Sequence, residues 1–171
     1  MGMRTAHIDV DTQLDFVVPA GALYVPGAEG ILERVGELNR EAVAAGHLLI
    51  ATMDAHSEND LEFKSWPHHC VVGSLGQRKA EQTIVLGMRV VEKQSVDCFT
   101  NPEMAEILRA EGVEEAVVYG VVTEICVLNA VRGLMDRGIR VRVVADAVKE
   151  LNVDARDRFF GEVRGRGGII A

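Results

Sequence analysis

The sequence predicts a three-layer α/β/α fold around a mostly parallel β-sheet of about six strands. Short β-rich runs alternate along the chain with segments of helical periodicity. The β-rich runs are largely apolar, as expected of parallel strands that helices cover on both faces. The chain has 171 residues, near the commonest domain size, so residues 1–171 are expected to form a single domain with one core.

Each element follows from its local pattern. Within one helical segment, Ile31, Val35 and Leu38 recur on one face, and Gly46 ends the segment. Pro102 suits the first turn of another helix. The expected strands are 3–10, 47–53, 89–92, 116–119, 140–145 and 168–170. The expected helices are 28–45, 102–110, 124–137 and 154–163.

Composition narrows the classes of partner and the compartment. The 26 acidic and 18 basic side chains give a formal net charge of −8, which disfavours nucleic acid and anionic membranes as partners. No apolar run approaches the roughly 20 residues that span a bilayer, and residues 1–10 do not read as a signal peptide. We therefore expect a cytoplasmic protein. Its three cysteines, an odd number, argue against a disulfide framework.

Reactive side chains follow several of the predicted strands. In open α/β sheets, ligand sites form at the carboxyl ends of the strands. The long segment 54–87, rich in His, Asp and Glu, also leaves one of these ends, and connections of that length are usually functional. The residues expected at this edge are Asp11, Gln13, Asp15, Asp54, His56, Lys93 and Cys126.

Cys126 is the candidate nucleophile. Thr123 is a predicted N-cap, which places Cys126 in the first turn of the helix that follows. A helix N-terminus favours a thiolate, and its free N–H groups can hold an oxyanion. The alternative is a buried structural cysteine, since free thiols pack well in cores.

Asp11 and Lys93 are candidate partners of this thiol. A carboxylate can take the thiol proton and later protonate a leaving amine. Asp9 and Asp15 are rivals for that role on the residues alone. Lys93 would favour the thiolate through its charge, although a lysine at a strand end is more often solvated.

A metal site is predicted in the segment 54–87. Asp54 and His56 are two apart on an extended segment and so point the same way. His68 or His69 would supply a third ligand, and because they are adjacent only one is expected to bind. Glu62 is a weaker candidate. Carboxylate and imidazole ligands suit one divalent ion of zinc, manganese or iron; the alternative is a histidine-rich loop without metal.

Four motifs, in order, resemble those of nicotinamidases within the isochorismatase-like cysteine hydrolases. The resemblance runs along essentially the whole chain, and the four motifs together are far more specific than any one. The matching segments are DTQLDF at 11–16, D-x-H at 54–56 with WPHHCV at 66–71, Lys93, and GVVTEICV at 120–127.

The resemblance implies a role for each matched position. It selects Asp11 over its rivals, and His69 over His68 as the third metal ligand after Asp54 and His56. It also implies a cis Val121–Val122 peptide, with the N–H groups of Val122 and Cys126 in the oxyanion hole. The residues implied to line the substrate pocket are Phe16 and Trp66.

The same resemblance implies an activity and a fold. The fold is the Rossmann-like isochorismatase-like hydrolase fold, and the reaction converts nicotinamide, and by extension pyrazinamide, to the acid and ammonia. A divalent metal ion and a homo-oligomer are further implied. The departures bear on the substrate rather than the chemistry: Val122 where alanine is common, Asp97 and Cys98 where serine and alanine are common, and GSLGQ at 73–77 where T-P-G-A is expected.

The sequence leaves two alternatives open. One is a related cysteine hydrolase that acts on another small amide or an ester; its metal-free members lack the histidines found here at 56 and 69. The other is a non-enzymatic metal-binding or redox-sensing module, in which Cys126 is an oxidisable thiol. Asp11 and Lys93 have no part in that second reading.

Overall fold

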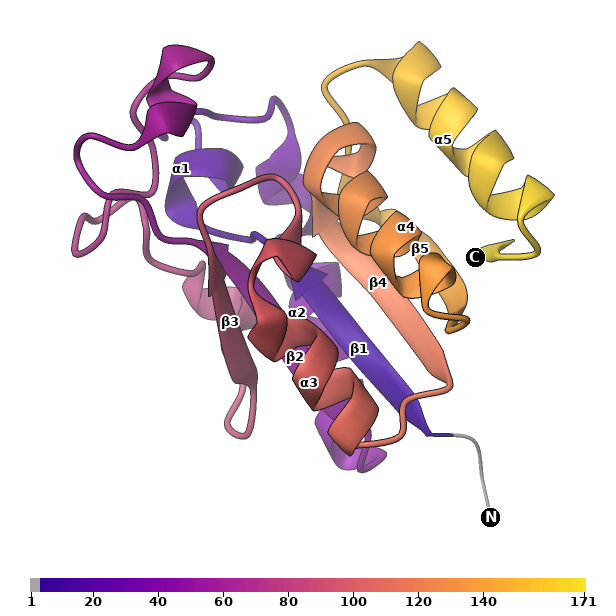
Figure 1. The fold of residues 1–171 in the computed structure, drawn as a ribbon. Coiled ribbons are helices and arrows are strands. Elements are labelled where there is room, and N and C mark those ends of the chain that lie inside the picture. Colours follow the sequence, from indigo (N-terminus) through magenta and orange to yellow (C-terminus); the bar gives the residue numbers. More distant parts are fainter. Residues whose placement is uncertain (1–3) are drawn as a thin grey trace.

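A six-stranded parallel sheet forms the centre of the protein, described by a computed structural model over residues 4–171 (Figure 1). Its strand order is β3-β2-β1-β4-β5-β6, and every neighbouring pair is parallel. This confirms the predicted fold class. The strands are β1 Thr5–Val10, β2 Leu48–Asp54, β3 Arg89–Lys93, β4 Glu115–Val121, β5 Arg140–Lys149 and β6 Ile169–Ile170.

Helices cover both faces of the sheet. In Figure 1, α3, α4 and α5 lie in front of the sheet and α2 lies behind it. Within residues 4–171, no helix has both the length and the apolar character needed to cross a membrane. The helices are α1 Leu14–Val17, α2 Leu32–Ala44, α3 Pro102–Ala110, α4 Leu128–Asp136 and α5 Val153–Gly165.

The structure differs from the predicted boundaries at several places. The predicted helix 28–45 begins as a 3-10 turn, Ala28–Ile31, before α2. The predicted helix 124–137 begins as a π-helix, Thr123–Val127, and Thr123 is its first residue, with no side-chain cap on the helix. The Thr123 N-cap prediction is therefore wrong. The short helix α1 was not predicted.

Two strand predictions also need adjustment. The predicted first strand began at residue 3, which lies outside the described residues; the strand itself begins at Thr5. The strand predicted to end at 145 continues to Lys149, because the ladder shifts register beyond Val118 and then pairs Gly120 with Val148.

The face of β1 toward α2 carries a buried polar cluster. Asp9 Oδ2 lies 2.6 Å from Lys79 Nζ and accepts a hydrogen bond from Asn39 Nδ2 at 2.7 Å. Asp9 Oδ1 accepts a bond from Thr12 Oγ1 at 2.8 Å. Asp9, a rival for the role of catalytic carboxylate, is therefore held in a separate network behind the sheet.

Candidate active site

Four strands deliver the predicted catalytic and metal-site residues to one edge of the sheet. Asp11 follows β1, Asp54 ends β2 and Lys93 ends β3. The register pairs Asp54 directly with Lys93. Cys126 lies in the π-helix that follows β4.

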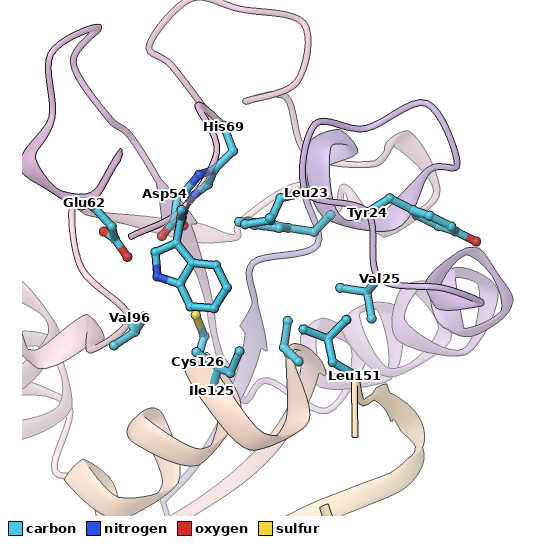
Figure 2. A pocket seen from close by; sticks show the side chains of 13 residues that line it. Leu23, Tyr24, Val25, Asp54, Glu62, His69, Val96, Ile125, Cys126 and Leu151 are labelled. Carbon is cyan, nitrogen blue, oxygen red and sulfur yellow. Dashed lines mark ion pairs between the residues drawn. The ribbon is translucent and has the colours of Figure 1, made fainter. Parts of the chain in front are cut away.

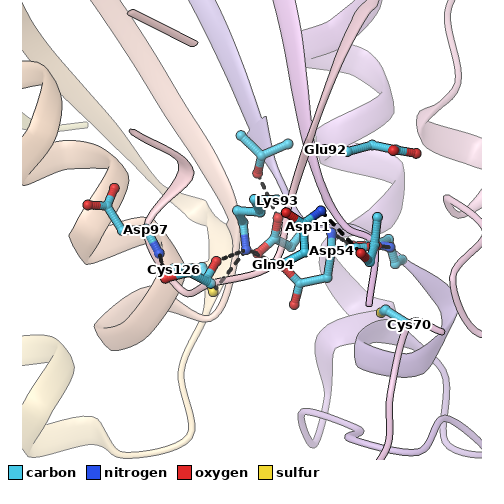
Figure 3. A network of polar contacts seen from close by, with 12 residues as sticks. Asp11, Asp54, Cys70, Glu92, Lys93, Gln94, Asp97 and Cys126 are labelled. Carbon is cyan, nitrogen blue, oxygen red and sulfur yellow. Dashed lines mark hydrogen bonds and ion pairs between the residues drawn. The ribbon is translucent and has the colours of Figure 1, made fainter. Parts of the chain in front are cut away.

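Lys93 is the centre of a buried ionic cluster at this edge (Figure 3). Its ammonium Nζ lies 2.8 Å from Asp11 Oδ2 and also contacts Asp54 Oδ1. It donates to the Ser95 carbonyl at 3.0 Å and lies 3.7 Å from Cys126 Sγ. A buried lysine with these partners is paired rather than solvated, so the structure places it beside both the acid and the thiol.

The Asp11 carboxylate is held in place from β2. Thr52 Oγ1 donates to Asp11 Oδ1 at 2.6 Å, and the Asp11 N–H donates to the Thr52 carbonyl at 3.1 Å. Asp11 has a φ of 51°, in the left-handed region that non-glycine residues rarely adopt. Thr52 was missed from the sequence, where its only signal was a hydroxyl within an apolar strand.

Burial governs the protonation of this cluster. It raises the pKa of Asp11, an effect that Lys93 opposes and the charge of Asp54 reinforces. It also raises the pKa of the Cys126 thiol, with Lys93 again opposing. The nearby charges of Asp11, Cys126 and Asp54 outweigh burial at Lys93 and raise its pKa. Burial thus opposes the stabilisation of the thiolate that was expected from the helix start.

Beside this cluster, one carboxylate oxygen faces two imidazoles. Asp54 Oδ2 lies 3.5 Å from His56 Nε2 and 3.5 Å from His69 Nε2. The opposite ring nitrogens have partners of their own: His56 Nδ1 lies 3.0 Å from Asp60 Oδ2, and His69 Nδ1 lies 2.7 Å from the Pro67 carbonyl. Such second contacts orient the rings of metal-binding histidines. Asp60 was missed, although its spacing of four from His56 was a signal.

The unpartnered atoms of this group fit a divalent cation. Among the described residues, His56 Nε2 and Glu62 Oε2 are buried without a hydrogen-bond partner, and they lie 3.7 Å apart. Asp54, His56 and His69 can each direct one ligand atom to a common point. Imidazole with carboxylate is a ligand set typical of zinc and related ions. The residues therefore fit a metal, with Glu62 within reach as a further ligand.

The structure separates the two adjacent histidines. His69 is buried in the cluster, whereas His68 is exposed and stacks on Phe63 with ring centroids 4.3 Å apart. Cys70 is turned away, with its Sγ 3.9 Å from the Gly76 carbonyl. Burial raises the pKa of the Cys70 thiol, so it is a poor competitor for the metal.

The remaining polar residues of the segment 11–16 hold the site together. Gln13 Nε2 donates to the Asp54 carbonyl at 2.8 Å, and Gln13 Oε1 accepts from the Asp54 N–H at 2.7 Å. Asp15 Oδ2 accepts from the Cys70 N–H at 2.7 Å. Asp15, the other rival of Asp11, thus fixes the loop that carries His69.

A mostly apolar pocket opens over the Cys126 thiol (Figure 2). The predicted pocket residues Phe16 and Trp66 both line it, and Phe16 also packs against His69 with ring centroids 5.5 Å apart. The Val121–Val122 peptide is cis, as the resemblance implied, and Val122 lines the pocket. Lining residues that sequence reasoning missed are Leu23, Tyr24, Val25, Val96, Ile125 and Leu151.

Comparisons with known proteins identify the family and the fold of the chain. Residues 5–171 match the family model described as the isochorismatase domain. The crystal structure of a pyrazinamidase of Pyrococcus horikoshii in complex with zinc has a TM-score of 0.92 and 32% identity, covering 98% of each chain. The nicotinamidase/pyrazinamidase of Mycobacterium tuberculosis is 28% identical, covering 93% of this chain and 94% of its own.

A further relative shows how varied the named substrates are. A streptothricin hydrolase of Streptomyces noursei is 32% identical over 158 residues, covering 88% of this chain and 56% of that protein. The parallel α/β sheet carries a buried thiol, carboxylate and ammonium at its carboxyl edge, and the relatives with this fold place the chain in the class of hydrolases. Within that class, the chain belongs to the isochorismatase family.

Proposed function

We propose that this protein is a metal-containing cysteine amidohydrolase that converts nicotinamide to nicotinate and ammonia, and pyrazinamide by the same chemistry. The observation that carries the proposal is that one pocket contains both the Cys126 thiol and the ligand group Asp54 and His69. A ring nitrogen and a carboxamide of one small substrate could then meet the two groups together. Such a reaction would belong to NAD metabolism in the cytoplasm.

In the first half of the reaction, Asp11 acts as the base. It takes the proton from Cys126 Sγ, and the sulfur electron pair forms a bond to the amide carbon. The Lys93 ammonium, 3.7 Å from the sulfur, stabilises the thiolate as it forms. The carbonyl electrons move onto oxygen, which in this proposal accepts hydrogen bonds from the N–H groups of Val122 and Cys126.

In the second half, the protonated Asp11 acts as the acid. The C–N bond breaks, the nitrogen takes the Asp11 proton, and ammonia leaves a thioester on Cys126. Asp11, again a carboxylate, removes a proton from water as the water attacks the thioester. The C–S bond then breaks, Asp11 returns that proton to Cys126 Sγ, and the carboxylic acid is released. Because burial raises the pKa of Asp11, this carboxyl group can both accept and return a proton.

The metal serves orientation in this proposal. Asp54, His56 and His69 would hold the ion, with Glu62 beside them. When bound, a divalent ion supplies a Lewis acid for a pyridine or pyrazine nitrogen, which fixes the ring while its carboxamide faces Cys126. The identity of the ion, zinc, manganese or iron, is left to measurement, and a homo-oligomer remains a prediction.

A second candidate is hydrolysis of a different small amide or an ester by the same thiol. Two relatives support this candidate, because they are equally similar to the chain but are named for different substrates. One is a pyrazinamidase and the other a streptothricin hydrolase, and each is 32% identical to this chain. The residues that attack the carbonyl would be the same. Only the body of the substrate in the pocket would differ.

Ammonia release tests the proposal. Wild type, purified without chelator, is assayed with nicotinamide, pyrazinamide and a panel of aliphatic amides, beside Cys126→Ala and the matched control Cys98→Ala. Cys98 is also buried but does not line the pocket. We expect turnover of nicotinamide by wild type and Cys98→Ala, and none by Cys126→Ala. Turnover of other amides alone would select the second candidate.

A further inference from the structure

The outer wall of the pocket is formed by the turn between β5 and α5. Leu151 follows β5 and lines the same pocket as Cys126, yet its side chain is 50% exposed. Figure 2 shows Leu151 and Val25 on one side of the pocket, while Asp54 and His69 lie on the other. A half-exposed side chain that faces both the pocket and solvent lies where a substrate must enter.

This wall is fastened to the helix that carries the nucleophile. Glu124 lies two residues before Cys126 in the π-helix. Its Oε1 accepts hydrogen bonds from two consecutive backbone N–H groups, those of Leu151 at 2.9 Å and Asn152 at 2.7 Å. Bonds from N–H groups to a carboxylate are stronger than neutral ones, so one side chain fixes the turn against the π-helix.

The same contact fixes the start of α5. Asn152 is the N-cap of that helix, and its Oδ1 accepts from the Ala155 N–H at 2.9 Å. Glu124 therefore holds both a residue of the pocket wall, Leu151, and the N-cap residue of α5, Asn152. Loss of Glu124 would leave the backbone of the turn without this anchor, and Leu151 could then move away from the pocket.

We propose that Leu151 is a specificity-determining residue and that Glu124 is the positioning residue that sets it. Together they limit access to Cys126 to compounds whose body is compact and apolar on the side away from Asp54 and His69. Substrates with a bulky or charged substituent on that side are excluded. The inference rests on the proposed function in one respect, that Cys126 is the reacting atom.

Alkylation of Cys126 by two maleimides tests the wall without requiring any turnover. N-methylmaleimide and N-phenylmaleimide carry the same reactive group and differ in bulk, and mass spectrometry identifies adducts on Cys126. The variants are Leu151→Ala and Glu124→Ala. Glu124→Gln keeps the Oε1 acceptor, and Leu86→Ala removes the same atoms from a side chain that is 95% exposed and does not line the pocket.

The quantity compared is the rate with N-phenylmaleimide divided by the rate with N-methylmaleimide. We expect Leu151→Ala and Glu124→Ala to raise this ratio by about 10-fold, the lower range for a group fitted to an apolar pocket. Glu124→Gln and Leu86→Ala should stay within about twofold of wild type on the same scale. An unchanged ratio in Leu151→Ala would show that Leu151 does not determine specificity. Equal effects of Glu124→Ala and Glu124→Gln would show that Glu124 does not position Leu151.

The outcome is separable from that of the proposed function. If the variants raise the ratio but the protein hydrolyses no amide, the role of Leu151 is supported and the proposed amidase function is refuted. If nicotinamide is hydrolysed but the variants leave the ratio unchanged, the amidase function is supported and the role of Leu151 is refuted. The same variants assayed with nicotinamide and with a 5-substituted nicotinamide should shift kcat/KM toward the larger amide.

Discussion

Lys93 Nζ lies 2.8 Å from Asp11 Oδ2, and both side chains are 1% exposed. The ammonium reaches the Cys126 sulfur from the same position, at 3.7 Å. A single buried cation thus joins the proposed base to the proposed nucleophile. Its removal would leave the carboxylates of Asp11 and Asp54 buried without their counter-charge.

Lys93→Met should therefore lower kcat/KM for amide hydrolysis by at least about 100-fold, because the thiolate loses its only nearby positive charge among the described residues. Arg89→Met is the matched control, since Arg89 lies on the same strand but its side chain is 49% exposed and pairs with Glu111. Steady-state kinetics on both variants decide the matter. Equal activity in Lys93→Met and wild type would contradict the role.

Activity should fall as the pH is lowered through the pKa of Asp11. The carboxylate form is the base, so protonation removes it. Burial raises this pKa above the ordinary aspartate value of 3.8, so the acid limb of the kcat/KM profile should lie above that value. The exposed Asp157→Asn should keep the limb unchanged, and Asp11→Asn should be inactive across the range. A profile flat down to the ordinary range of an aspartate would refute the assignment.

Metal content should depend on one of two adjacent histidines. His69→Ala should lose bound metal because His69 Nε2 faces Asp54, and His68→Ala should keep it because His68 is exposed. Asp60→Asn should weaken metal affinity by roughly 10–100-fold, the range for a residue that orients a ligand. Elemental analysis and competition with a chromogenic chelator measure both effects. Loss of metal in His68→Ala but not in His69→Ala would reverse the ligand choice.

The buried ion pair of Asp9 and Lys79, on the face of the sheet toward α2, should affect the stability of the protein more than its catalytic activity. Lys79→Met removes the cation partner of the buried Asp9 side chain, and breaking a buried pair in this way costs about 3–5 kcal/mol. The double variant Asp9→Asn with Lys79→Met should recover part of that loss. Lys64→Met, at an exposed lysine, is the control. Urea unfolding gives the free energies, and an unchanged midpoint in Lys79→Met would show that the ion pair contributes nothing.

Strand and helix positions were predictable because their signals are local. Apolar runs marked the strands, and Pro102 marked the start of α3 at the residue where the structure begins it. Because ligand sites form at the carboxyl ends of parallel strands, the strand positions alone predict that Asp11, Asp54 and Lys93 lie together. The positions of the strands and helices follow from periodicity alone, and the edge at which the site forms follows from the direction of the parallel strands.

Other features depend on contacts between distant segments and left no local signal. The hydrogen bonds from Leu151 and Asn152 to Glu124 join residues 27 and 28 positions apart. The π-helix at Thr123–Val127 replaced the expected capped α-helix. The burial that raises the pKa of Cys126 was not visible either, because the sequence shows the position of a thiol at a helix start but not what covers it.

Trapping of the acyl-enzyme tests the central claim most directly. Wild type and Cys126→Ala are mixed with nicotinamide, quenched in acid during turnover, and digested for mass spectrometry. We predict a nicotinoyl thioester on the peptide that carries Cys126, present in wild type and in Cys98→Ala. Hydrolysis of nicotinamide by Cys126→Ala at a rate near that of wild type would contradict it.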